Sequence, residues 1–132
     1  MFHPPHDRDD RETVIRDAIA TIDEFAARFN ARDLAGMDAL LHFPHLILSG
    51  ENLIVWDEPG QVDPDYFAEL AESGWSHSIY HEKQPLLVST RKVHLLVGYT
   101  RNRADGAAMS SHQLMMVVTC ENGFWGIKQR SY

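Results

Sequence analysis

The chain has 132 residues, 44% of them hydrophobic, and a formal net charge of −7 at pH 7. These totals fit one domain with a hydrophobic core, and the acidic balance argues against nucleic-acid and membrane partners, whose anionic surfaces would repel the protein. The one cysteine, Cys120, leaves no internal disulfide to form, and residues 1–7 lack the basic and apolar segments of a signal peptide. We therefore expect a cytoplasmic protein.

The N-terminal part predicts a tail followed by a long helix. Residues 1–10 are rich in proline, histidine and charge and are expected to be a flexible tail, which leaves 11–132 as a single domain. Apolar residues then recur every three or four positions up to Phe29, which is typical of an amphipathic helix. Asp9 or Asp10 is the expected N-cap, because a short acceptor side chain satisfies free backbone N–H groups there.

The middle of the chain predicts two more helices and two short strands. A second helix is expected from Asp33 to Leu41, and Pro44 should end it because proline cannot continue a helix. An aspartate followed by a proline frequently starts a helix, the aspartate as its cap and the proline in its first turn. The further elements are a third helix that starts at Asp63-Pro64 and stops at Gly74, and strands at 45–49 and 53–56.

The last part of the chain predicts an antiparallel meander. Its four strands are expected at 76–88, 92–103, 107–120 and 124–132. Asp105-Gly106 and Asn122-Gly123 suit the type I′ turn, which requires positive φ at both central residues. The register that follows from two-residue loops is Ala104 opposite Ala107, Glu121 opposite Phe124 and, at a weaker hairpin, Ser89 opposite Lys92.

Two stretches, 29–34 (FNARDL) and 122–127 (NGFWGI), together with the element order ααββαββββ, carry a family resemblance. The chain resembles the nuclear-transport-factor-2-like (NTF2-like) superfamily, also called SnoaL-like or ketosteroid-isomerase-like. This resemblance implies an α+β, cystatin-like cone in which three N-terminal helices pack on a curved, mostly antiparallel sheet. The superfamily contains isomerases, dehydratases, polyketide cyclases and non-catalytic binding proteins, so the function must be inferred from the residues of the site.

One face of the predicted sheet is apolar at one end and polar at the other. The apolar part should meet the helices and form the floor of a pocket. Two cross-strand rows of polar residues follow on the same face: Glu82, Tyr99 and His112, then Tyr80, Arg101 and Ser110. Neighbours within a row lie roughly 5 Å apart. We therefore expect a pocket for a small apolar molecule with one polar end.

The first of these rows also favours chemistry. A carboxylate, a phenol and an imidazole buried together can serve as acid, base and hydrogen-bond donor near neutral pH. The candidate catalytic residues are therefore His112, Glu82 and Tyr99, and the candidate ligand-binding residues are Tyr80, Tyr99, Arg101, His112, His81 and Trp56. The alternatives are a purely ligand-orienting role and a solvated strand end. A bulge at Pro85 would change the inward set, so that Glu82 leaves and His77, His81 and Lys83 enter.

Several other chemistries are not expected. The ketosteroid-isomerase-like members carry a base aspartate in a region that here reads Ile-Leu-Ser at 47–49, and their second acid would fall near Met115. That isomerase mechanism is therefore not expected. Ser110, Ser111 and His112 are neighbours on a strand whose side chains alternate between faces, so we expect no nucleophile and base pair among them.

The eight histidines do not predict a metal site. His77 and His81 would stand about 13 Å apart along one strand, which is too far for both to bind one ion. His42 and His45 have no carboxylate or cysteine nearby to complete a ligand set. The sequence also has no glycine-rich phosphate loop. We therefore expect neither a metal nor a cofactor.

Three functions fit these patterns. The first is a small-molecule-binding pocket protein, the second is a cofactor-free SnoaL-like lyase or isomerase that uses the His, Glu and Tyr row, and the third is a dimeric interaction module with a filled cavity. A homodimer is expected through the outer sheet face, whose apolar side chains exceed what a solvated face should show. That face is predicted to carry Leu96, Met115, Val117 and Phe124, with Thr119, Lys128 and Arg130 as a polar rim.

Overall fold

The structure is a computed structural model, and it describes residues 8–132. The tail predicted for residues 1–10 falls mostly outside the described residues. Its last three residues already belong to helix α1 (Arg8–Asn30), so Asp9 and Asp10 lie in the first turn of the helix and not at its cap. Among the described residues, no helix is both long and apolar enough to cross a bilayer.

The fold is α+β, with one mixed six-stranded sheet. After α1 come α2 (Leu34–Asp38), β1 (Leu41–Ser49), β2 (Asn52–Trp56), α3 (Tyr66–Glu72), β3 (His77–Ser89), β4 (Lys92–Asn102), β5 (Ala108–Glu121) and β6 (Phe124–Ser131). Two helices thus precede the sheet and the third lies between β2 and β3. The strand order is β2-β1-β6-β5-β4-β3, in which β1 pairs parallel with β6 and the other neighbours are antiparallel.

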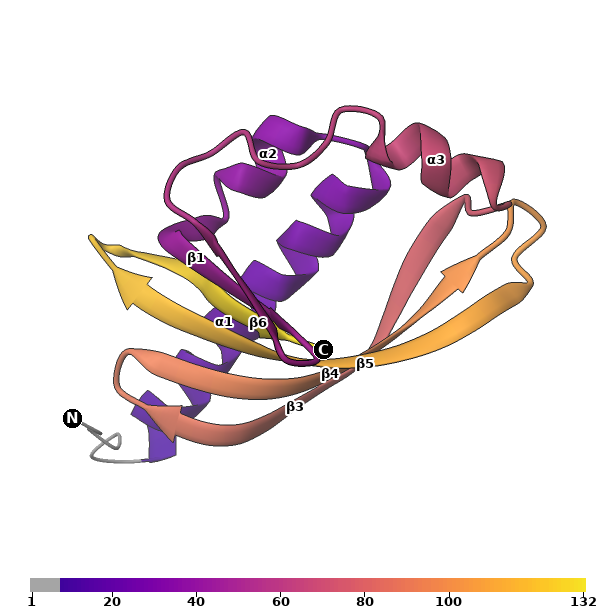
Figure 1. Ribbon diagram of the computed structural model, residues 1–132. Coiled ribbons are helices and arrows are strands. Elements are labelled where there is room, and N and C mark those ends of the chain that lie inside the picture. The colour runs from indigo at the N-terminus through magenta and orange to yellow at the C-terminus, as the bar shows by residue number, and fades with distance from the viewer. Residues whose placement is uncertain (1–7) are drawn as a thin grey trace.

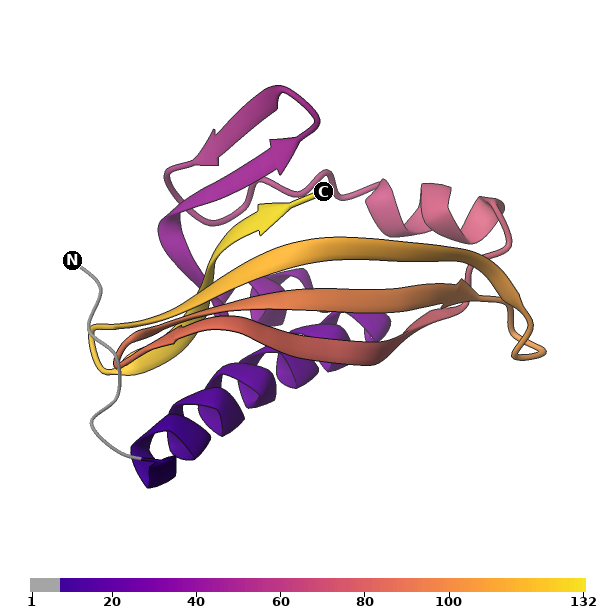
Figure 2. The same cartoon turned by 90° about the horizontal axis from the view of Figure 1, so that it is seen from below.

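The sheet bends strongly, and α1 packs across it (Figure 1). Figure 2 shows the β1–β2 hairpin turned away from the three long strands β3, β4 and β5. The core forms where the apolar stripe of α1 meets the inner face of the sheet. Its fully buried members include Ala18 and Ile22 from the helix and Val93, Leu95, Val97, Val118 and Ile127 from the strands. Burial of each large side chain stabilises the fold by about 1.5–3 kcal/mol.

Three element boundaries in the middle of the chain differ from the prediction. The second helix ends at Asp38, and Pro44 lies inside β1 where it was expected to follow a helix. Proline is tolerated there because the pairing of β1 with β6 is irregular between Leu41 and Leu46, so no ladder hydrogen bond is lost. The third helix starts at Tyr66, because the Asp63 carboxylate accepts a hydrogen bond from the Asp65 backbone N–H and holds a turn before the helix.

The two glycine turns differ from each other. Asn122 and Gly123 both have positive φ, 54° and 83°, and Glu121 pairs with Phe124, which confirms the type I′ turn. At the other turn Gly106 is left-handed but Asp105 is not, so the two-residue loop predicted there is wrong. The loop is longer, and an irregularity after it restores the predicted register, in which Tyr99 lies opposite His112.

Candidate functional site

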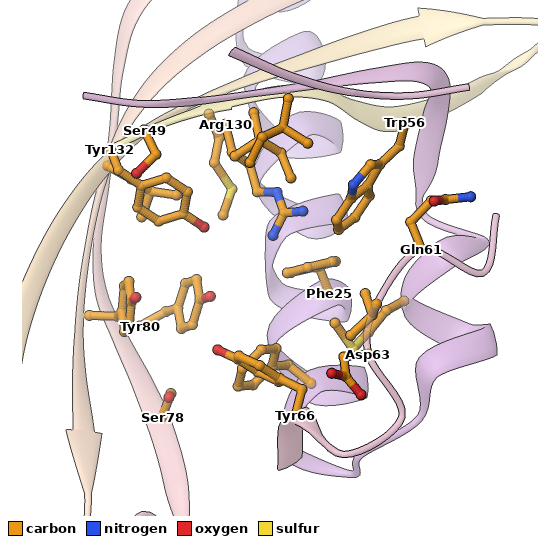
Figure 3. Close-up of a pocket in the computed structure, with 18 of the residues that line it drawn as sticks. Phe25, Ser49, Trp56, Gln61, Asp63, Tyr66, Ser78, Tyr80, Arg130 and Tyr132 are labelled. Atoms are coloured by element: carbon orange, nitrogen blue, oxygen red, sulfur yellow. The ribbon is translucent and has the colours of Figure 1, made fainter. Parts of the chain in front are cut away.

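A cavity of about 460 Å³ lies between the helices and the hollow side of the sheet. Figure 3 shows its lining, to which α1, the β1–β2 hairpin, the segment before α3 and the long strands all contribute. The side chains that form most of the wall are Phe25, Phe29, Met37, Ile47, Ile54, Trp56, Tyr66, Tyr80, Tyr99, Leu114, Met116 and Tyr132. The size and the aromatic wall are typical of a small-molecule site.

Arg130 is a polar group of this cavity that several contacts hold in place. Its Nε–H donates to His45 Nε2 at 3.0 Å. Its guanidinium carbon lies 5.6 Å from the ring centre of Phe25 and 5.5 Å from that of Trp56, so the two rings hold it as cation–π partners. In Figure 3 the guanidinium points into the cavity between these rings.

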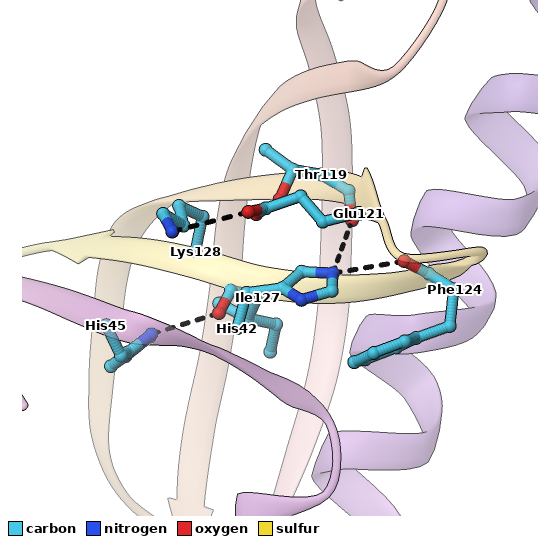
Figure 4. Close-up of polar contacts among 7 residues, drawn as sticks. All are labelled: His42, His45, Thr119, Glu121, Phe124, Ile127 and Lys128. Atoms are coloured by element: carbon cyan, nitrogen blue, oxygen red, sulfur yellow. Dashed lines mark hydrogen bonds and ion pairs between the residues drawn. The ribbon is translucent and has the colours of Figure 1, made fainter. Parts of the chain in front are cut away.

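His45 is the support that fixes this arginine. It is fully buried, and its Nδ1 lies 3.0 Å from the carbonyl oxygen of Ile127 (Figure 4). Because arginine can only donate, His45 Nε2 must be the acceptor. Nδ1 therefore carries the proton and donates the hydrogen bond to the carbonyl oxygen of Ile127. Burial, reinforced by the positive charge of Arg130, lowers the pKa of His45 to about 4. The imidazole is therefore neutral near pH 7.

The prediction of Arg130 on the outer rim of the sheet is wrong, because β6 carries a bulge. Val118 pairs with Ile127, whereas Val117 pairs with Gln129, so one extra residue on β6 reverses the faces beyond it. Arg130 comes to lie opposite Met116 on the inner face. Gly126, which lies immediately before this bulge, is the one local signal for it. The sequence pattern did not place Arg130 in the cavity. It also did not indicate His45 as the support of Arg130, because His45 was expected to be the first residue of its strand.

The predicted row of Glu82, Tyr99 and His112 is wrong in its first member. The pairing of β3 with β4 shifts twice, once between Pro85 and Leu87 and once between Tyr80 and Glu82. Tyr80 therefore lies opposite Tyr99, and Glu82 lies opposite Gly98 and accepts a hydrogen bond from Gln113 Nε2 at 3.3 Å. The sequence predicts the possibility of a bulge at Pro85, but it does not predict the second shift, between Tyr80 and Glu82.

A single bulge at Pro85 was predicted to turn His77, His81 and Lys83 inward, and the structure places these three side chains differently. Lys83 contacts Asp23 of α1, so it does face the helix side of the sheet. His81 falls at the second shift and is exposed, and His77 Nδ1 lies beside the hydroxyl of Ser76. Neither histidine lines the cavity.

The observed row is a stack of Tyr80, Tyr99 and His112. The ring centres lie 5.1 Å and 5.0 Å apart, with interplanar angles of 15° and 20°. Both tyrosines line the cavity, as do Arg101 and Trp56, but His112 does not. Burial raises the pKa of Tyr80 and of Tyr99, and partial burial, followed by the charge of Arg101, lowers the pKa of His112. The row is therefore uncharged at neutral pH.

Ser110 and His112 do interact, which corrects the expectation that no serine and histidine pair would form. Residues two apart on a strand share a face, and Ser110 Oγ lies 2.7 Å from His112 Nε2. The pair lies on the rim of the sheet and outside the cavity lining.

The two histidines of β1 do not converge. His42 Nε2 donates to the carbonyl oxygens of Thr119 and Phe124, at 3.1 Å and 3.0 Å, whereas His45 is bound to Ile127 (Figure 4). Within residues 8–132, no three His, Cys, Asp or Glu side chains come together as a group that could hold a metal ion. His3 and His6 lie outside the described residues. The absence of a metal requirement stays a prediction.

Comparison with known proteins shows the fold. No protein-family profile matches the chain, and no curated protein sequence matches it. Solved structures do match. An NTF-2-like protein of unknown function from Shewanella oneidensis is 10% identical, with a TM-score of 0.62 over 88% of this chain and 95% of the other. A cystatin-like-fold protein of unknown function from Nostoc punctiforme is 12% identical, with a TM-score of 0.68 over 88% and 86%.

A third match is a ketosteroid isomerase-like protein from Erwinia carotovora atroseptica, 16% identical, with a TM-score of 0.60 over 89% of this chain and 92% of the other. At these identities the similarity shows the fold alone. The chain has the NTF2-like fold.

Proposed function

We propose that this chain is a small-molecule-binding pocket protein, built as the helix-covered cone typical of NTF2-like proteins. The ligand is a small, mostly apolar molecule with one polar end. The observation that carries this proposal is the cavity of about 460 Å³, whose wall is largely aromatic and whose fixed polar group is the guanidinium of Arg130. A cavity filled by its own side chains, as the interaction-module hypothesis requires, would not leave this volume.

The geometry supports binding better than catalysis by the predicted residues. Of the three candidate catalytic side chains, Tyr99 lines the cavity, whereas Glu82 and His112 do not. A base must lie within hydrogen-bond reach of the proton that it removes. The lyase or isomerase hypothesis therefore lacks an imidazole or a glutamate at the cavity wall. Tyr80, Tyr99 and Arg101 are assigned to contacting the ligand at the wall of β3 and β4, and Trp56 to contacting its apolar body, while Arg130 holds its polar end.

A thermal-shift screen with small aromatic compounds tests this function. A ligand at a hundred times its Kd stabilises the folded state by about 2.7 kcal/mol, which raises the melting temperature by several degrees. Leu114→Trp should abolish the shift because Leu114 is buried and lines the cavity, so a larger side chain fills it. The matched control is Met115→Trp, whose side chain lies on the opposite face of β5 and should leave the shift intact.

The screen would contradict the proposal in two ways. The first is that no compound shifts the melting temperature of the wild type, and the second is that Leu114→Trp, once shown to be folded, responds as the wild type does.

We also propose a homodimer through the outer sheet face. Phe124 is 42% exposed there, and Leu96 and Met115 are half-buried. Val117 is buried within the chain, and Arg130 lies on the inner face of the sheet. The exposed apolar patch on the outer face is therefore smaller than the sequence predicts. A second copy related by a two-fold axis would cover it, since one patch can then pair with itself.

A further inference from the structure

The charge inside the cavity is opposite to the charge of the whole chain. The protein carries a formal net charge of −7, yet the charged residues that line the cavity are Arg101, Arg130 and Asp63. Two guanidinium groups and one carboxylate leave the lining net positive. A ligand that matches this lining carries negative charge.

The guanidinium of Arg130 has hydrogen-bond donors available for an anion. Among the residues that the structure describes, no carboxylate forms an ion pair with it, and its hydrogen bond to His45 uses Nε. Because His45, Phe25 and Trp56 hold the guanidinium in place, the two Nη groups face the cavity as a rigid fork. A planar fork of this kind matches the two oxygens of a carboxylate.

Asp63 does not neutralise this group. Asp63 is exposed, and its Oδ1 already accepts a hydrogen bond from the Asp65 backbone N–H at 2.9 Å. The Asp63 carboxylate therefore stabilises the turn before α3, and solvent screens its charge. Arg130, in contrast, lies between two aromatic rings. Arg130 is the stronger determinant of ligand charge.

The number of fixed cations favours a singly charged ligand. Burying a charge is costly unless an opposite charge and hydrogen bonds offset it. One enclosed guanidinium can offset one negative charge, and a phosphate dianion would need Arg101, the second guanidinium of the lining, for its other charge. The neighbouring wall is aromatic, which suits a flat, unsaturated body.

We propose that the ligand is an aromatic or conjugated monocarboxylate whose carboxylate is bound by the fork of Arg130, with His45 as the residue that positions the fork. This inference rests on the proposed binding function. It adds the charge and the chemical class of the ligand, which the cavity volume does not determine.

Titration calorimetry with two matched probes, naphthoate and its neutral isostere naphthamide, tests this assignment. Wild-type protein should bind naphthoate at least about tenfold more tightly than naphthamide, because the neutral amide cannot form the charge-assisted bidentate pair with Arg130. Arg130→Gln should bring the two affinities within about twofold, and Arg130→Lys, which keeps the charge and loses the fork, should lie between. The control is Lys128→Gln, which removes a positive charge from the same strand outside the cavity lining and should keep the wild-type ratio.

The outcomes separate this inference from the binding function. If wild-type protein binds both probes equally, the carboxylate assignment is overturned while the pocket function stands. If naphthoate is preferred but Lys128→Gln removes the preference as fully as Arg130→Gln, general charge attraction explains it and the assignment to Arg130 is overturned. If neither probe binds at millimolar concentration, both proposals fail together. The wild-type comparison does not depend on whether a variant folds.

Discussion

Acid should destabilise this protein through a single buried histidine. The pKa of His45 is lowered from an ordinary 6.5 to about 4 by burial and by Arg130. The unfolded chain therefore binds the proton more tightly than the folded chain, so stability is full above pH 6.5 and is lost as the pH falls toward 4. One pKa unit corresponds to about 1.4 kcal/mol, which makes the loss about 3 kcal/mol.

Urea unfolding from pH 7 to pH 4 measures this effect. We expect the free energy of unfolding of the wild type to fall by about 3 kcal/mol more than that of His45→Gln, which cannot titrate but keeps an acceptor for Arg130. His81→Gln removes an exposed histidine and should follow the wild type. If wild type and His45→Gln lose stability in parallel, His45 is not the buried neutral acceptor described above.

Three further predictions concern the core, the assembly and metals. Ile22→Ala should lower the free energy of unfolding by about 2–5 kcal/mol in denaturant titrations, because Ile22 is fully buried against the sheet. A loss under 1 kcal/mol would contradict that packing. Sedimentation at tens of micromolar should show a wild-type dimer and a Met115→Lys monomer; a monomeric wild type would refute the proposed interface. Chelator should leave the melting temperature unchanged, and a drop of several degrees would reveal a stabilising ion.

The sequence predicted the fold where its signals were local. The apolar stripe of α1 and the type I′ turn at Asn122-Gly123 each follow from a few neighbouring residues, and both are confirmed. The register at Tyr99 and His112 is also confirmed, although the loop that was used to derive it differs. Local patterns were therefore enough to predict most of the elements and the register of β4 with β5 at the site.

The site itself depended on bulges, which the sequence marks only weakly, through Pro85 in β3 and Gly126 in β6. A strand keeps its alternating pattern on both sides of a bulge, so the pattern alone does not reveal that the faces have been exchanged. This exchange removed Glu82 from the row with Tyr99 and brought Arg130 into the cavity. His45 acquires its role from contacts with β6, more than 80 positions away along the chain. Such contacts can be inferred only after the strand order is known.

The central claim is that this cavity is a ligand site, and NMR of the methionine methyl groups is its most direct test. Met37 and Met116 line the cavity, whereas Met115 adjoins Met116 on β5 but points to the other face. With methyl-labelled methionine and added naphthoate, the account predicts shifts of the Met37 and Met116 signals at concentrations that leave Met115 unmoved. Shifts confined to Met115, or absent from all three at millimolar naphthoate, would contradict it.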